Sequence, residues 1–130
     1  MIQRFIELGQ GYSDLYELIT LGDNMSERVQ HVMAFHTVLT NGENRTSVAI
    51  VMKPTQPGDF QPIYICREGI PYPHDLANKR YDMFQNMAER INKNIIELTV
   101  RPSGVFGETE LFYQHLIGIL RMNNYIAPLK

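Results

Sequence analysis

Three β-rich segments follow one another between residues 29 and 67, with only turn-forming residues between them. The first two, residues 29–39 and 46–52, flank the dipeptide Asn41-Gly42, which is typical of hairpin turns. A stretch with two prolines and a glycine, residues 53–59, separates the second segment from the third, residues 60–67. Strands joined by such short connections pair antiparallel, so we expect a three-stranded meander.

The residues within this meander also indicate where two of its strands lie in the sheet. Residues 48–51 are apolar on both faces of the second strand, which predicts a central strand covered on both sides. Pro62 in the third strand has no N–H to donate to a neighbour, which predicts an edge position for that strand.

Five further segments complete the predicted secondary structure. In chain order they are a strand over residues 2–8, a helix from Ser13 to Gly22, a helix that begins at His74-Asp75 with Asp75 as N-cap and ends near Ile91, a strand over residues 95–100 and a helix over residues 107–122. The order β-α-β-β-β-α-β-α predicts the α+β class. We expect a mixed sheet of about five strands, including the antiparallel meander, packed against about three helices in a single domain over residues 1–130.

The charge balance and the single cysteine exclude several classes of function. The chain has 12 Lys+Arg against 14 Asp+Glu, so it has no basic field that would attract nucleic acid or an acidic membrane surface. No stretch approaches the roughly 18–20 apolar residues that span a bilayer, and the N-terminal residues lack the apolar run of a signal peptide. The lone Cys66 excludes an intramolecular disulfide, and we expect it to be a buried, reduced thiol in a cytoplasmic protein.

The sequence contains no recognised catalytic, cofactor-binding or metal-binding motif, so we predict no catalytic residue, no cofactor and no metal. His31 and His36 are five residues apart on one strand, so they point to opposite faces, and we expect each to be a core or surface residue. The phosphate-binding pattern G-x-x-x-x-G-K-[ST] is missing. A metal-dependent nuclease needs a carboxylate two residues before a lysine such as Lys53, and Val51 stands there.

Charged and aromatic residues gather around the connection between the third strand of the meander and the following helix. They are Arg67, Glu68, Tyr72, His74, Asp75 and Lys79. Because helix N-termini bind anions through free backbone N–H groups, a small anionic ligand could be held by Arg67, Lys79 and the helix end, with His74 as proton donor. The alternative is purely structural: Asp75 caps the helix and His74 stays in solvent. Glu68 then pairs with Lys79 or Arg80.

Three segments make the chain resemble a known group of proteins: residues 1–9 (MIQRFIELG), 62–71 (PIYICREGIP) and 113–123 (YQHLIGILRMN). Together they resemble a family of small uncharacterised proteins of spore-forming Gram-positive bacteria, a domain of unknown function, over nearly the whole chain. Some members of that family carry the name methylthioribose kinase. The chain has no Gly-rich phosphate loop and no catalytic-loop Asp motif, so the resemblance implies no kinase site residues.

Two hypotheses of different class follow. The last helix is apolar almost all round from Leu111 to Met122, so it is either buried on several faces or covered by another subunit. We therefore expect a non-enzymatic cytoplasmic binding or regulatory module that works as a homodimer through this C-terminal helix and can have a further protein partner, but neither nucleic acid nor membrane. The second hypothesis is a small enzyme or sensor that binds an anionic metabolite or nucleotide at the corner formed by Arg67, His74 and Lys79.

Overall fold

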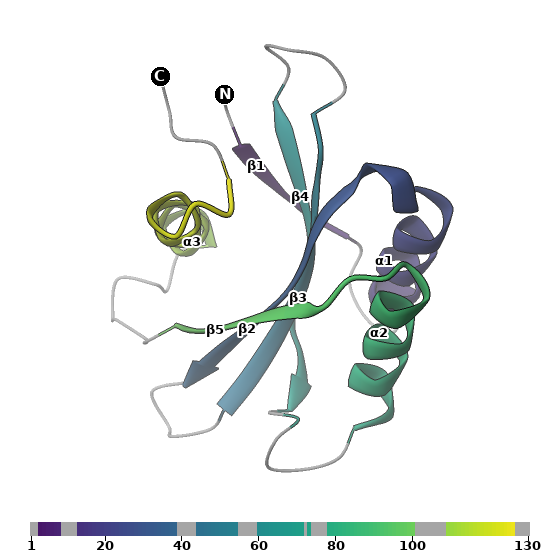
Figure 1. The fold of residues 1–130 in the computed structure, drawn as a ribbon. Helices are drawn as coiled ribbons and strands as arrows, with labels where there is room; N and C mark the ends of the chain where they lie inside the picture. The colour runs from purple at the N-terminus through teal and green to yellow at the C-terminus, as the bar shows by residue number, and fades with distance from the viewer. Residues whose placement is uncertain are drawn as a thin grey trace.

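The computed structural model describes residues 3–8, 13–38, 44–54, 60–71, 73, 78–100 and 109–126. These residues form five strands, three α-helices and one short 3-10 helix (Figure 1). In chain order the elements are β1 (Gln3–Glu7), α1 (Ser13–Asn24), η1 (Ser26–Arg28), β2 (Val29–Val38), β3 (Asn44–Met52), β4 (Gln61–Pro71), α2 (Lys79–Arg90), β5 (Ile95–Val100) and α3 (Thr109–Met122). The predicted order β-α-β-β-β-α-β-α is confirmed.

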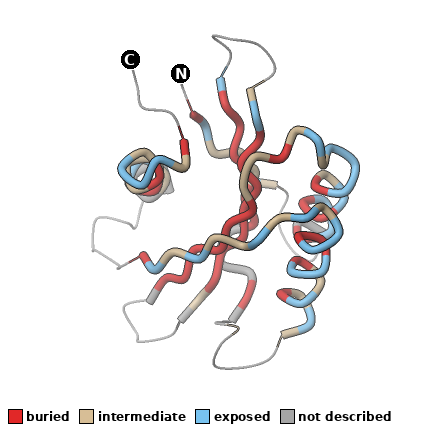
Figure 2. Tube along the Cα trace, in the orientation of Figure 1, coloured by how far each residue is buried: buried red, intermediate tan, exposed pale blue. Residues whose placement is uncertain are grey.

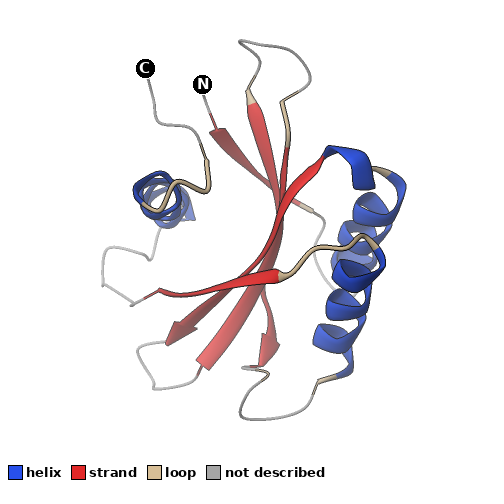
Figure 3. Cartoon of the chain, in the orientation of Figure 1, coloured by secondary structure: helices blue, strands red, loops and turns tan. Residues whose placement is uncertain are grey.

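The five strands form one mixed sheet in the order β1-β4-β3-β2-β5 (Figure 3). β2, β3 and β4 pair antiparallel as a meander, whereas β1 runs parallel to β4 and β5 runs parallel to β2. The predicted α+β class, with a meander inside a five-stranded mixed sheet and three helices, is therefore confirmed.

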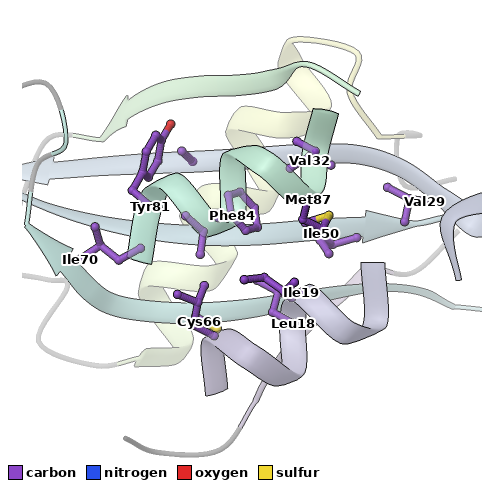
Figure 4. Close-up of a cluster of buried hydrophobic side chains, with 14 of the residues drawn as sticks. Leu18, Ile19, Val29, Val32, Ile50, Cys66, Ile70, Tyr81, Phe84 and Met87 are labelled. Atoms are coloured by element: carbon purple, nitrogen blue, oxygen red, sulfur yellow. The ribbon is translucent and has the colours of Figure 1, made fainter. Parts of the chain in front are cut away.

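The sheet is the middle of three layers, because α1 and α2 lie side by side on one face and α3 lies on the other (Figure 1). Under the helix pair, Leu18 of α1 and Phe84 and Met87 of α2 are fully buried (Figure 4). Under α3, Leu116 and Leu120 are fully buried against the opposite face. Each such side chain contributes about 1.5–3 kcal/mol by leaving water, so both helical layers are held on the sheet by apolar burial.

β3 is the central strand, and it is covered on both sides as predicted. Val48 and Ile50 belong to the core under α1 and α2, whereas Ala49 and Val51 belong to the core under α3. All four residues are fully buried. Figure 2 shows the buried residues running along the middle of the sheet.

The predicted edge position of the third meander strand is wrong. Among the described strands, β4 lies inside the sheet between β1 and β3, and the outer edges belong to β1 and β5. Pro62 is the second residue of β4 and lies opposite Arg4 of β1. On the other side, the pairing with β3 begins only at Ile63, opposite Val51. Pro62 therefore lies before the first residue of β4 that pairs with β3, and an internal strand tolerates a proline without N–H at such a position.

α1 does not end at Gly22, as the sequence predicted, but continues to Asn24. Gly22 is buried at the contact between α1 and α2, so its small size serves helix packing rather than helix termination. The next residue, Asp23, accepts hydrogen bonds from Nε (3.2 Å) and Nη2 (2.9 Å) of Arg90 in α2. The two helices are thus joined by an apolar contact and an ion pair on its exposed side.

α2 begins at Lys79 and its N-cap is Asn78, so the prediction of Asp75 as N-cap is wrong. The carboxamide oxygen of Asn78 accepts hydrogen bonds from the backbone N–H groups of Arg80 (2.8 Å) and Tyr81 (3.3 Å). Asparagine caps a helix as well as aspartate does, and the structure uses Asn78, three residues after Asp75.

α3 presents one apolar side to the sheet and a polar side to solvent. Leu116 and Leu120 are buried, Gln114 and His115 are exposed, and Met122 at the end of the helix is 84 % exposed. Of the apolar residues of this helix whose side chains are described, Leu116 and Leu120 are buried within the chain's own fold, and the others are half-buried or, like Met122, exposed. None of the described helices combines the length and apolarity needed to cross a membrane.

A chain of side-chain amides fastens the end of α3 to the sheet. Arg121 donates to Oε1 of Gln3 from Nε (3.0 Å) and Nη2 (2.5 Å), and Gln3 donates to Gln61 at 3.4 Å. Gln61 donates to Gln30 at 2.7 Å, and Gln30 donates to the backbone carbonyl of Tyr125 at 3.5 Å. Gln3 and Gln61 lie opposite each other on β1 and β4 and are buried. The hydrogen bonds all run in one direction, so each carboxamide both donates and accepts.

Candidate functional site

A groove of about 520 Å³ lies between α2 and β5, on the sheet face that carries the helix pair. Its charged residues are Asp82, Glu89, Lys93 and Glu97, and its amide side chains are Asn78, Gln85 and Asn94. The volume lies within the range of small-molecule sites, about 300–1,000 Å³. This groove is the candidate ligand site of the described part of the chain.

At the β5 wall of the groove, Glu97 is held by a buried histidine. Nε2 of His36 lies 2.8 Å from Oε1 of Glu97, and Nδ1 of His36 lies 2.8 Å from Oγ1 of Thr46. Thr46 is fully buried and His36 is 6 % exposed, whereas the Glu97 side chain is 39 % exposed. An imidazole with the proton on Nε2 satisfies both contacts, since it donates to the carboxylate and accepts from the hydroxyl.

The sheet brings these three residues together. Thr46 of β3 lies opposite His36 of β2, and Glu97 of β5 lies opposite Ala34, two residues before His36. Residues two apart on a strand share a face, so all three side chains lie on the face covered by α2. The cluster therefore depends on β5 returning to pair beside β2.

The arrangement can orient a carboxylate, and it does not expose a nucleophile. The order hydroxyl, imidazole, carboxylate resembles that of a hydrolase triad, but the Thr46 oxygen is buried beneath the histidine and no substrate reaches it. Cys66 is also buried, at 3 % exposure, which confirms the predicted buried thiol. What the groove offers to a ligand is the oriented carboxylate of Glu97.

The charge in the groove is predominantly negative. Asp82, Glu89 and Glu97 supply carboxylates, and the ammonium group of Lys93 donates to the backbone carbonyl of Gln30 at 3.5 Å. Within the residues that the structure describes, no group of three or more His, Cys, Asp or Glu side chains could hold a metal ion. The negative charge of the groove suits a group that bears positive charge or several hydrogen-bond donors.

The predicted corner of six residues is described only in part. Tyr72, His74 and Asp75 lie outside the described residues, and Arg67 and Glu68 are described in β4 by their backbone alone. Lys79, the first residue of α2, is exposed. Convergence of these side chains on one ligand stays a prediction.

His31 and His36 lie on opposite faces of the sheet. The His31 ring packs edge-on against Tyr125 beyond the end of α3, with the ring centroids 5.7 Å apart, whereas His36 is on the α2 face. Burial lowers the pKa of His31, a backbone hydrogen bond with Tyr125 raises it, and the nearby Lys93 charge lowers it, so the sum is a lowered pKa.

Sequence analysis did not single out the cluster of His36, Thr46 and Glu97. Two signals for it are in the sequence. His36 and Thr46 are equally far from Asn41 of the hairpin, which places them opposite each other, and Glu97 is the one charged residue in residues 95–100. The link between them needed the position of β5 beside β2, and no short-range pattern provides that.

The fold and the groove define a small three-layer α+β domain with a candidate ligand site beside an edge strand. The chain belongs to the family described as "Domain of unknown function (DUF7147)", whose model matches residues 1–126. No curated protein and no solved structure matches it.

Proposed function

We propose that this chain is a non-enzymatic binding module, and that its ligand is a small molecule with a cationic nitrogen, bound between α2 and β5. The observation that carries the proposal is the carboxylate of Glu97, fixed at 2.8 Å by the buried His36 at the wall of a 520 Å³ groove. A carboxylate held in one orientation loses little side-chain entropy when a ligand binds, so it favours recognition.

The other groove residues define the chemistry of the ligand. Asp82 and Glu89 on α2 add negative charge across from Glu97, so an ammonium or guanidinium group gains attraction from several carboxylates. The amide side chains of Gln85 and Asn94 supply both donors and acceptors for the rest of the molecule. An anionic molecule would meet net repulsion in this groove.

The binding role, as opposed to catalysis, is supported by the placement of the nucleophilic side chains. The hydroxyl of Thr46 and the thiol of Cys66 are both buried in the core under α1 and α2 or beside it. Neither faces the groove as a reactive group, so the groove residues act by holding a ligand.

A thermal-shift panel tests the proposal. The cationic probes are arginine, spermidine and choline, and the anionic probes are inorganic phosphate, citrate and ATP. A probe at about 100 times its dissociation constant adds roughly 2.7 kcal/mol to the free energy of unfolding, a rise of several degrees in a domain of this size. We expect a shift with a cationic probe that Glu97→Gln abolishes and the control Glu17→Gln, on the exposed surface of α1, leaves unchanged. A panel without a cationic shift contradicts the proposal.

The second candidate function is a small enzyme or sensor that binds an anionic metabolite or nucleotide at Arg67, His74 and Lys79. Exposed Lys79 at the first position of α2 supports it, since a cation there stands beside the helix N-terminus. The same panel separates the two candidates. A shift with phosphate or ATP that Arg67→Ala abolishes favours the anion site.

We further propose that the module acts as a homo-oligomer in the cytoplasm. The sequence-based prediction places the subunit contact on the C-terminal helix, where Met122 supplies an apolar side chain that is 84 % exposed. A protein partner other than a second copy is the remaining alternative for that surface.

A further inference from the structure

We propose that the groove between α2 and β5 binds a linear aliphatic amine with two cationic nitrogens, extended along α2. This inference rests on the proposed function, because it needs a groove that binds a cationic nitrogen, and it names the chemical class of that ligand. Three features of the groove carry it: its length along the helix, the spacing of the carboxylates on α2 and its apolar floor.

The groove is elongated and follows the axis of α2. The residues of α2 and its N-cap that line the groove are Asn78, Tyr81, Asp82, Gln85, Ala88 and Glu89. They recur with the three- and four-residue spacing of one helix face, so they form a stripe along the helix. Because a helix rises about 1.5 Å per residue, the stripe is roughly 16 Å long. A groove of this shape favours an extended chain over a compact ring.

Two carboxylates on this stripe are separated along the helix. Asp82 lies in the first turn of α2, and Glu89 follows seven residues later, near the end of the helix. Seven residues make almost two full turns, so both side chains project from the same side of the helix, about 10 Å apart along its axis. Both are exposed, and within the described part of the chain neither carboxylate takes part in a hydrogen bond or an ion pair. Each can therefore pair with a cation of the ligand.

β5 carries Glu97 away from the end of the groove where Glu89 lies. The connection between α2 and β5 lines that end through Lys93. From there β5 runs back beside α2 in the opposite direction (Figure 4). Glu97 is two residues after the first residue of β5, so it lies about 7 Å further along the strand, toward the half of the groove that Asp82 lines. One ammonium group of the ligand therefore lies between Asp82 and Glu97, and the other lies beside Glu89.

The ammonium group of Lys93 leaves these carboxylates available. It is directed to β2, where it donates to the backbone carbonyl of Gln30 at 3.5 Å. Among the residues that the structure describes, Lys93 forms no ion pair with Asp82 or Glu89. The groove keeps more negative than positive charge, so a molecule with two positive charges complements it better than a molecule with one.

The floor of the groove is apolar where its rim is charged. Tyr81 and Ala88 are buried and Ile95 is half-buried, whereas Asp82 and Glu89 are exposed. Methylene groups that lie on this floor leave water, which favours an aliphatic spacer between the two charges. In an extended chain three single bonds span at most about 3.6 Å, so a spacer of eight carbons separates two nitrogens by roughly 11 Å. A chain of this length reaches from Asp82 to Glu89.

Isothermal titration calorimetry at low salt with three probes tests the number and spacing of the charges. The probes are the linear eight-carbon diamine, the amino alcohol of the same length and the linear four-carbon diamine. The amino alcohol keeps one ammonium group, and the nitrogens of the four-carbon diamine are only roughly 6 Å apart. One exposed ion pair is worth up to about fivefold in affinity, so we expect the eight-carbon diamine to bind about fivefold more tightly than either of the others.

Substitutions of single carboxylates locate the two charges. Glu89→Gln should remove the preference for the eight-carbon diamine, because the second ammonium group loses its partner, and should leave the affinity for the amino alcohol unchanged. Glu97→Gln should weaken the binding of all three probes. Glu17→Gln, on the exposed surface of α1, is the matched control and should change none of the affinities.

Two results would overturn this inference and leave the proposed function in place. One is equal affinity for the eight-carbon diamine and the amino alcohol, since a single ammonium group then accounts for binding. The other is a preference for the diamine that Glu89→Gln does not change. Failure of the proposed function gives a different result, because then none of the three probes binds or Glu97→Gln weakens none of them, and the inference falls with it.

Discussion

Gly22 of α1 lies so close to Met87 of α2 that a Cβ atom on the glycine would stand 2.7 Å from the methionine sulfur. The same atom would stand 3.0 Å from Cδ1 of Ile50 in β3. Met87 and Ile50 are fully buried and lie next to each other in the core under the helix pair (Figure 4). The absence of a side chain at Gly22 therefore sets how closely α1 approaches α2 and the sheet.

Gly22→Ala should destabilise the protein although alanine is the better helix former. The gain in helix propensity is about 1 kcal/mol, whereas overpacking a buried contact costs about 1–3 kcal/mol. We expect a net loss of up to about 2 kcal/mol in the free energy of unfolding, measured by urea denaturation. Gly118→Ala in α3 is the matched control, because a Cβ there meets nothing within 4 Å. That variant should gain about 0.5–1 kcal/mol, and a gain in both would contradict the packing argument.

The cluster of His36, Thr46 and Glu97 predicts strongly non-additive substitutions. His36→Leu leaves the hydroxyl of Thr46 buried without its imidazole partner, which should cost about 1–3 kcal/mol. Adding Thr46→Val removes the unsatisfied hydroxyl, so the double variant should be more stable than His36→Leu alone. Glu97→Gln keeps a hydrogen-bond acceptor for Nε2 and should change stability by less than about 1 kcal/mol. Urea denaturation of the unsubstituted chain, His36→Leu, Thr46→Val and the double variant measures the coupling, and a double variant that loses the sum of both single effects would refute it.

Local patterns in the sequence determined which elements form and what class they build. Residues 95–100 were predicted as a strand with the observed bounds, and the Asn41-Gly42 turn with its flanking segments predicted the pairing of β2 with β3. The two-sided apolar residues 48–51 located the central strand. These features depend on neighbours within about ten residues, which the sequence displays directly.

The remaining features depend on contacts between distant parts of the chain. Pro62 led to the wrong prediction of an edge strand, because no local sequence pattern shows that β1 pairs with β4. Gly22 resembled a helix end because the approach of Met87 lies 65 residues further on. The groove escaped prediction for the same reason: Glu97 meets His36 only after β5 pairs with β2. Of the predicted site, Lys79 alone is fully described, and it begins α2.

The buried amide chain predicts that Gln61 is needed to hold the end of α3. Gln61 accepts from Gln3 and donates to Gln30, so Gln61→Met removes both of these hydrogen bonds. We expect a loss of about 1–3 kcal/mol in the free energy of unfolding and faster hydrogen exchange of the Tyr125 amide. Gln114→Met, at an exposed position of α3, should leave both quantities unchanged. Unaltered exchange at Tyr125 in Gln61→Met would show that the amide chain does not anchor the helix.

His31 makes the stability of the fold depend on pH. Burial lowers the pKa of its imidazole below 6.5, so the folded chain favours the neutral form. As the pH falls through 6.5, His31 becomes protonated in the unfolded chain while it stays neutral in the folded chain. The free energy of unfolding therefore falls until the pH passes the lower pKa of the folded state. His31→Phe keeps a ring against Tyr125 and removes the titration, so its melting temperature should fall less between pH 7.5 and pH 5.5 than that of the unsubstituted chain. Thermal melts at those two pH values measure the difference. Gln114→Ala, which leaves His31 in place, should follow the unsubstituted chain, and an equal fall in all three proteins would exclude His31 as the cause.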